Sequence, residues 1–209
     1  MATARTGSGV DKRRVILDAA VVVFARRGFH ACRVSDIADE AQVAYGLVYH
    51  YFRSKEEVLD TLFLERWNVL LEVISEIDGR DLPPREKLYA IGGFIMDSYR
   101  HDPDLMKVII VEVTRAANTF GRTHLGKIRE AYALIAEIVA KAQAEGSFKR
   151  KVTPQFAALA FYGAIEQVLT GWIFDQQPRA EAEVEQAKQF VVETICGGLD
   201  AAPASAATV

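Results

Sequence analysis

Apolar residues recur at three- and four-residue spacing along most of the chain, which is the period of an amphipathic helix. Ile16, Ala20, Val23 and Phe24 form one such stripe, and Gly28 ends it. Strand signals, namely β-branched runs bounded by turn dipeptides at short spacing, do not recur along the sequence. The pattern therefore predicts an all-α fold.

Capping residues and helix breakers divide this pattern into about nine helices. Asp11 is a candidate cap for the first helix. Asp102-Pro103 and Thr153-Pro154 each place a capping residue before a proline at the first helical position. The first five predicted helices cover about residues 12–27, 34–41, 44–51, 55–77 and 84–99. The sixth begins at residue 103 and is interrupted at residues 118–126, and the seventh runs from this interruption to about residue 145. The last two cover about residues 154–174 and 180–195.

The first three helices have the organisation of a small DNA-binding domain. The second and third are short and separated by a tight turn, as in a helix-turn-helix, and the first supplies a hydrophobic wall behind them. We expect a flexible tail at 1–10, a helix-turn-helix domain at 11–55, a ligand-binding and dimerisation domain at 56–200, and a second tail at 201–209.

An aromatic cluster in the third helix indicates what this domain contacts. Val48 and Phe52 are four residues apart and can face the wall, whereas Tyr45 and Tyr49 share another face that has no partner inside so small a domain. Such a cluster is also typical of a buried core. The major groove of DNA would supply a partner, because tyrosine hydroxyls reach phosphates and the rings pack on sugar or thymine methyl groups. Lys55, just beyond the helix, would hold a phosphate.

Charge is distributed unevenly and favours the DNA interpretation. The whole chain has a net charge of −3, but residues 1–55 contain nine Lys and Arg and only five Asp and Glu. A basic end on an acidic body suggests that this end meets a polyanion.

The two cysteines, Cys32 and Cys196, lie far apart without a CxxC spacing, so neither a disulfide framework nor a zinc site is expected. A reducing cytoplasm fits this composition. The first residues lack the apolar core of a signal peptide, and no apolar run approaches the roughly 18–20 residues that span a bilayer. We therefore expect a cytoplasmic protein with no membrane partner.

Few groups of residues in this sequence have a spacing that could indicate a catalytic or metal-binding site. His30, Cys32 and Asp36 are close together but flank the start of a DNA-facing helix. His101 and Asp104 surround Asp102, which is better explained as a helix cap than as a metal ligand. We predict no catalytic residue, no metal and no cofactor.

The segment ILDAAVVVFARRGFHACRVSDIADEAQVAYGLVYHYFRSKEEVLDTLF, within about residues 12–65, resembles the DNA-binding domain of the TetR family of bacterial transcriptional regulators. The resemblance implies a three-helix head on an all-α body that binds a ligand and forms a dimer. Leu47 and Cys32 depart from the threonines common in the family, which affects the bases read rather than DNA binding itself. By motif position, the family's DNA contacts fall on Arg33, Ala44, Tyr45, Gly46, Tyr49, His50, Tyr51 and Lys55.

The body, with QAEGSFKRKVTP and FYGAIEQVLTGWIFDQQ, is similar to TetR-family regulators of fatty-acid degradation, which respond to long-chain acyl-CoA. A basic group around residues 115–129 could bind the effector's phosphates or could be a solvated surface. The alternative effector is a lipophilic drug or another hydrophobic metabolite. The candidate effector residues are Phe94, Tyr99, Ile109, Val113, Arg115, Arg122, Phe161, Tyr162 and Trp172.

These inferences predict a homodimeric repressor on a pseudo-palindromic operator, released by its effector. Two other classes stay open: an all-α enzyme, and a DNA architectural protein without an effector. The last two helices of each subunit would pair into a four-helix bundle. The residues expected at that interface are Phe161, Ile165, Leu169, Phe190, Val191 and Ile195.

Overall fold

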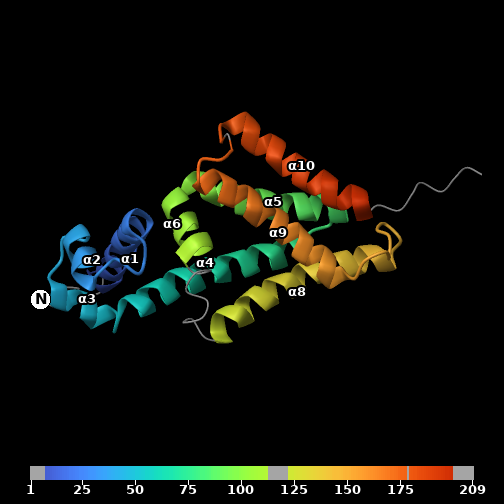
Figure 1. Ribbon diagram of the computed structural model, residues 1–209. Helices are drawn as coiled ribbons and strands as arrows, with labels where there is room; N and C mark the ends of the chain where they lie inside the picture. Colours follow the sequence, from blue (N-terminus) through green and yellow to red (C-terminus); the bar gives the residue numbers. More distant parts are fainter. Residues whose placement is uncertain (1–7, 113–121, 178, 200–209) are drawn as a thin grey trace, which may run out of the picture. The chain divides into compact units, whose positions relative to one another are not determined.

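The fold is all-α, as predicted, in a computed structural model that describes residues 8–112, 122–177 and 179–199 (Figure 1). Among these residues, one short π-helix, η1, accompanies the α-helices. The elements are α1 (Ser8–Arg27), α2 (Val34–Glu40), α3 (Tyr45–Tyr51), α4 (Lys55–Asp78), α5 (Pro84–His101), α6 (Pro103–Lys107), η1 (Val108–Glu112), α8 (Arg122–Ala144), α9 (Pro154–Ile173) and α10 (Glu181–Leu199).

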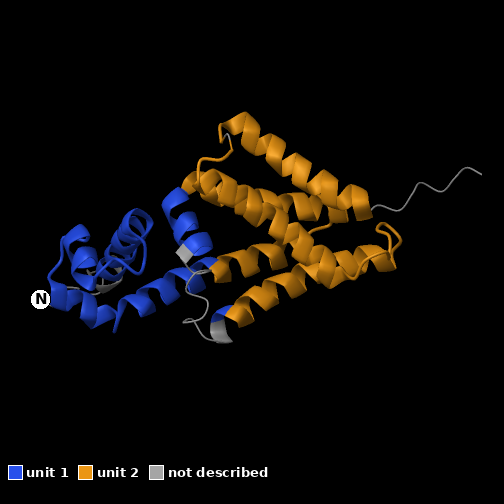
Figure 2. Ribbon diagram, in the orientation of Figure 1, with its two compact units in different colours: residues 1–66, 102–124 blue, residues 67–101, 125–209 orange. Residues whose placement is uncertain are grey.

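The chain forms two compact units (Figure 2). Unit 1 comprises residues 1–66 and 102–124, and unit 2 comprises residues 67–101 and 125–209. This division differs from the sequence-based boundary at residue 56, because the first half of α4 belongs to unit 1. The segment that begins at Asp102 also belongs to unit 1 rather than to the body.

Unit 1 is built around α1, which packs against α2 and α6. Ile16, Leu17 and Phe24 of α1 are fully buried. Gly28 ends α1 with a φ of 80°, a left-handed conformation that glycine adopts without steric cost. The helix begins at Ser8, so Asp11 lies inside it and the prediction that Asp11 caps it was wrong.

Unit 2 has its core where α5, α9 and α10 pack together. Gly92 marks a close approach of α5 to α9, because a Cβ at this position would lie 3.4 Å from both Ile165 Cδ1 and Phe161 Cζ. Lys188 of α10 is buried and donates to both carboxylate oxygens of Asp97 on α5, at 2.7 and 2.8 Å. Small residues and this ion pair therefore hold α5 among its neighbours.

Both predicted cap–proline signals begin helices. The Asp102 carboxylate accepts a hydrogen bond from the Leu105 N–H at 2.9 Å at the start of α6. The Thr153 hydroxyl accepts one from the Phe156 N–H at 3.2 Å at the start of α9. These bonds satisfy amides that have no partner within the helix.

Helix α9 is more apolar than expected. Of the described helices, it alone is long and apolar enough to cross a membrane by length and composition, with 20 residues and a mean hydropathy of 1.3. The statement that no run approaches this length was therefore wrong for α9. A core helix of a soluble protein has the same two properties, and Phe161, Ile165 and Leu169 of α9 are buried inside unit 2.

Candidate functional site

Helix α3 divides into the two faces that its spacing predicts. Val48 and Phe52 are only 1% and 2% exposed and pack inside unit 1. Tyr45 and Tyr49, on the other face, are 53% and 45% exposed. Two large aromatic side chains therefore stand on the surface of a domain that has a complete core of its own.

The two tyrosines form a pair. Their ring centroids lie 5.1 Å apart at an interplanar angle of 71°, an edge-to-face arrangement. The Tyr45 hydroxyl donates to the Tyr49 hydroxyl oxygen at 3.2 Å, and this hydrogen bond raises the pKa of Tyr49. The Tyr49 hydroxyl thus keeps its proton and can donate it to an external acceptor.

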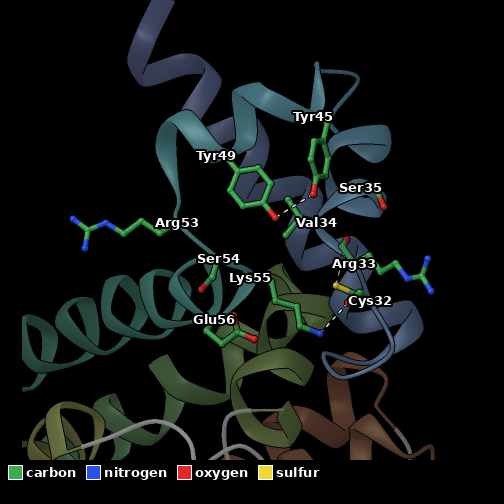
Figure 3. Close-up of a pocket in the computed structure, with 10 residues that line it drawn as sticks. All are labelled: Cys32, Arg33, Val34, Ser35, Tyr45, Tyr49, Arg53, Ser54, Lys55 and Glu56. Atoms are coloured by element: carbon green, nitrogen blue, oxygen red, sulfur yellow. Dashed lines mark hydrogen bonds between the residues drawn. The ribbon is translucent and has the colours of Figure 1, made fainter.

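The tyrosine pair borders an open hollow of about 570 Å³ (Figure 3). Its walls come from the start of α2, from α3 and from the first turn of α4. The side chains of Arg33 and Arg53 extend away from the tyrosine pair, in opposite directions in this view. Arg53 also lines this hollow and was not among the predicted site residues, although its place directly after the aromatic helix could have indicated it.

The predicted DNA contacts fall into two groups by exposure. Arg33, Ala44, Tyr45, Gly46, Tyr49 and His50 are exposed, whereas Tyr51 and Lys55 are half-buried. Gly46 lies in open space, because a Cβ built on it would meet no atom within 4 Å. The exposed group leaves the first turn of α3 accessible to a groove.

Several basic residues of unit 1 are paired within the protein. Arg13 contacts Glu65 at 2.9 Å, and Arg27 contacts Asp36 at 2.7 Å. The Arg33 backbone N–H donates to Asp36 at 2.8 Å, and this bond, together with the Arg27 charge, lowers the pKa of Asp36. The positive charge available to DNA is therefore smaller than the count of basic residues suggests.

Lys55 is placed differently from its prediction as a phosphate ligand. Its ammonium donates to the backbone carbonyls of Phe29 at 2.8 Å, His30 at 3.2 Å and Cys32 at 2.9 Å. A lysine ammonium has three N–H donors, so these bonds use all of them. In this structure Lys55 is bound to the loop between α1 and α2.

Cys32 does not have the environment of an activated nucleophile. The side chain is buried, and burial raises the pKa of its thiol to about 11. A reactive cysteine requires a lowered pKa. In the part of the chain that the structure describes, no group of three or more His, Cys, Asp or Glu side chains could hold a metal ion.

The candidate effector residues are distributed over both units. In unit 2, Tyr99 of α5 and Trp172 of α9 have ring centroids 5.7 Å apart, and the Tyr99 hydroxyl donates to the Trp172 carbonyl at 3.1 Å. Phe161 is buried, and Phe94 and Tyr162 are half-buried. Ile109 is buried in unit 1. Val113, Arg115 and the Arg122 side chain lie outside the described residues.

A second aromatic group in unit 2 was not predicted as a group. Tyr162 lies with its ring centroid 5.8 Å from that of Trp67 and 5.3 Å from that of Tyr132. Glu166, one turn further along α9, has a pKa that burial raises. The contributions come from α4, α8 and α9, so no spacing along the sequence could have revealed them together.

The residues predicted at the dimer interface occupy different environments. Phe161, Ile165, Leu169 and Val191 are at most 5% exposed in the subunit's own core, so they are closed to a partner in this arrangement. Phe190 is 70% exposed, and Ile195 is half-buried. Phe190 borders a hollow of about 670 Å³ between α9 and α10. Other exposed large apolar residues on or next to α9 are Phe156, Leu159 and Phe174.

Comparison with known proteins agrees with this architecture. The family model of bacterial regulatory proteins of the TetR family matches residues 16–62, and a tetracycline-repressor-like C-terminal domain matches residues 84–195. The fatty acid metabolism regulator protein of Bacillus subtilis is 31% identical over 163 residues, covering 78% of this chain and 84% of the relative.

The chain belongs to the TetR family.

Two solved structures of the family are similar over nearly their whole length. The fatty acid degradation regulator FadR from Bacillus halodurans has a TM-score of 0.74 and 28% identity, covering 90% of this chain and 97% of that one. FadR from Bacillus subtilis in complex with stearoyl-CoA has a TM-score of 0.74 and 27% identity, covering 88% and 98%. As a TetR-family protein, the chain is a transcription regulator with a helix-turn-helix that binds DNA.

Proposed function

We propose that this TetR-family protein is a cytoplasmic homodimeric repressor, without catalytic activity, that a long-chain acyl-CoA releases from a pseudo-palindromic operator. The observation that carries the proposal is the similarity to FadR of Bacillus subtilis in complex with stearoyl-CoA. That similarity covers 88% of this chain and so includes the body as well as the DNA-binding end.

The side chains of unit 2 support an apolar effector. Phe94 and Tyr162 are half-buried aromatic side chains, and the partial burial of Glu166 raises the pKa of its carboxyl group and so disfavours the charged form there. The phosphates of an acyl-CoA would require cations elsewhere, for which Arg115 and Arg122 are the sequence-based candidates.

Exposed residues on α9 and α10 support the homodimer. Phe190 and the hollow between α9 and α10 present apolar surface that a second copy would cover, with Phe156 and Leu159 further along α9. We therefore assign the interface to these exposed residues, with Ile195 at its edge, and assign the buried ones to the subunit core.

A DNA-binding titration with acyl-CoAs tests the effector. Affinity for the ligand should rise with chain length from about eight to about eighteen carbons, because each buried methylene contributes about 0.8 kcal/mol. Saturating ligand should weaken operator binding by about 5–150-fold, the range of a typical allosteric coupling. Free CoA serves as the control, and Arg115→Ala and Arg122→Ala should need more ligand.

Release that is independent of chain length, or arginine variants that respond like the wild type, would reject the acyl-CoA proposal. A lipophilic drug or other hydrophobic metabolite would then be the better effector class. Tighter DNA binding with ligand would instead reject release as the mechanism. None of these outcomes affects the assignment of the DNA-binding helix.

A further inference from the structure

Lys55 occupies the point where the loop between α1 and α2 meets the start of α4. Its ammonium lies 2.8 to 3.2 Å from three loop carbonyl oxygens and 4.7 Å from the centroid of the Phe29 ring. Carbonyls in such a loop have no helical partner and require donors. Lys55 supplies three donors from a single side chain, and the aromatic face adds a cation–π contact.

The turn that carries Lys55 is itself held in place. The Glu57 N–H donates to the Ser54 hydroxyl oxygen at 3.3 Å, and the Glu57 carboxylate accepts from the Arg53 N–H at 2.6 Å. These reciprocal bonds are similar to a capping box and fix the first turn of α4. The Lys55 side chain that binds the loop carbonyls is therefore attached to a helix turn whose backbone is itself held by hydrogen bonds.

The fastened loop leads directly into the DNA-facing surface. Cys32, whose carbonyl Lys55 binds, is followed by Arg33, and the Arg33 N–H is held by Asp36 at 2.8 Å. Arg33 thus has its backbone restrained on both sides at the start of α2. Figure 3 shows Lys55 beside this segment, with its ammonium directed at the Cys32 carbonyl.

We propose that Lys55 is a positioning residue for DNA recognition rather than a phosphate ligand: it fastens the α1–α2 loop to α4 and so fixes the Arg33 backbone at the hollow that the tyrosine pair borders. A phosphate could recruit this ammonium only by taking it from three carbonyls. The proposal rests on DNA binding by this surface.

Salt dependence distinguishes the two roles. Each phosphate that a cation neutralises adds about 0.9 to the slope of log K against log salt, so removing one such cation from each head of a dimer lowers the slope by about 1.8. Lys55→Met keeps the aliphatic stem and removes the ammonium. Arg53→Met is the matched control, since Arg53 is an exposed cation two residues away.

Binding is measured on a duplex selected from a random library with the wild-type protein, and on an unrelated duplex. Arg53→Met should weaken both and flatten the slope. Lys55→Met should keep the wild-type slope and the affinity for unrelated DNA, but lose operator affinity by about tenfold. A residue that is merely structural would reduce the active fraction without changing the ratio of the two affinities. A flattened slope in Lys55→Met, or an unchanged affinity ratio, would overturn the proposal.

A labelling experiment on the wild-type protein needs neither a folded variant nor DNA binding. Reductive methylation with mass-spectrometric readout should modify the exposed Lys12 readily and Lys55 slowly in the free protein, because the Lys55 ammonium is engaged within the chain. If Lys55 reacts as fast as Lys12 in free protein, the proposal fails, whatever the outcome for DNA binding.

Discussion

Replacing Phe190 by alanine tests the interface that we assign to α9 and α10. The side chain is 70% exposed in the isolated subunit. An aromatic side chain presents roughly 150–250 Å² of surface, so about 140 Å² per copy would be covered on association. At about 25 cal/mol per Å² this corresponds to about 3.5 kcal/mol per copy, and to about 7 kcal/mol for the two copies as an upper bound.

Only part of that free energy is expressed in affinity, because association also orders side chains and desolvates polar groups. A loss of about 3 kcal/mol on Phe190→Ala is a reasonable expectation, which is about a hundredfold weaker dimer. Sedimentation equilibrium over a range of protein concentrations measures this constant. Circular dichroism should show an unchanged fold, since Phe190 contributes little to the subunit core.

Val69→Ala provides the matched control. Val69 is also an exposed apolar residue, at 42%, but it lies on α4 rather than on α9 or α10. It should leave the dissociation constant within about threefold of the wild type, the ordinary scale of a surface substitution. Equal effects of the two variants, or a Phe190→Ala dimer as tight as the wild type, would refute the assignment.

Contacts on three other parts of the molecule give further expected outcomes. Replacing thymine by uracil in a half-site should weaken operator binding by the wild type by about 0.8 kcal/mol for each methyl group that a tyrosine covers, and should weaken binding by Tyr49→Ala less. Equal losses of binding free energy in the two proteins would exclude that contact. Gly92→Leu should lower the free energy of unfolding in urea by about 1–3 kcal/mol, because even a Cβ would lie 3.4 Å from Ile165, and unchanged stability would contradict this packing. Burial lowers the pKa of His124 below 6.5, so the unfolded chain takes up the proton first and stability should fall as pH drops below 6.5. Urea titrations across this window should show a weaker pH dependence in His124→Gln, and an identical dependence would remove His124 as the cause.

The sequence predicted those parts of the fold that local chemistry determines. Asp102 and Thr153 each precede a proline, and each caps a helix that begins where expected. The two faces of α3 also followed from spacing alone, because Tyr45 and Tyr49 are four residues apart and share one face, whereas Val48 lies about 100° around the helix from Tyr49. Signals of this kind act within one turn and need no knowledge of distant segments.

Burial on α9 could not be predicted in the same way. The helix is apolar on several sides, so periodicity does not show which side faces α5 and α10 and which is left to a partner. Phe161 and Leu169, which were predicted to lie at the dimer interface, are buried within the subunit. Phe156 and Leu159 are exposed but were not assigned to the interface. Only the packing of the three helices separates these two sets.

The sequence also could not show which groups pair with the basic residues. This pairing reduces the positive charge that is available for DNA binding. The excess of basic residues in the first 55 suggests a strongly electrostatic contact. In the structure, the basic residues engaged within unit 1 are Arg13 and Arg14 with Glu65, Arg26 with Glu40, Arg27 with Asp36, and Lys55 with three carbonyls. Among the described residues of this segment, the exposed cations without such a contact are Lys12, Arg33 and Arg53.

So few available cations imply a shallow salt dependence, because each phosphate contact contributes only about 0.9 to the slope. Phosphate contacts set position but do not read sequence. Recognition must then depend on the shape of the surface beside those cations, where Tyr45 and Tyr49 hold each other edge to face and Gly46 leaves room for a close approach. A surface of this kind discriminates only if its parts are held in register, and the bond network around Lys55 provides that restraint from within the protein.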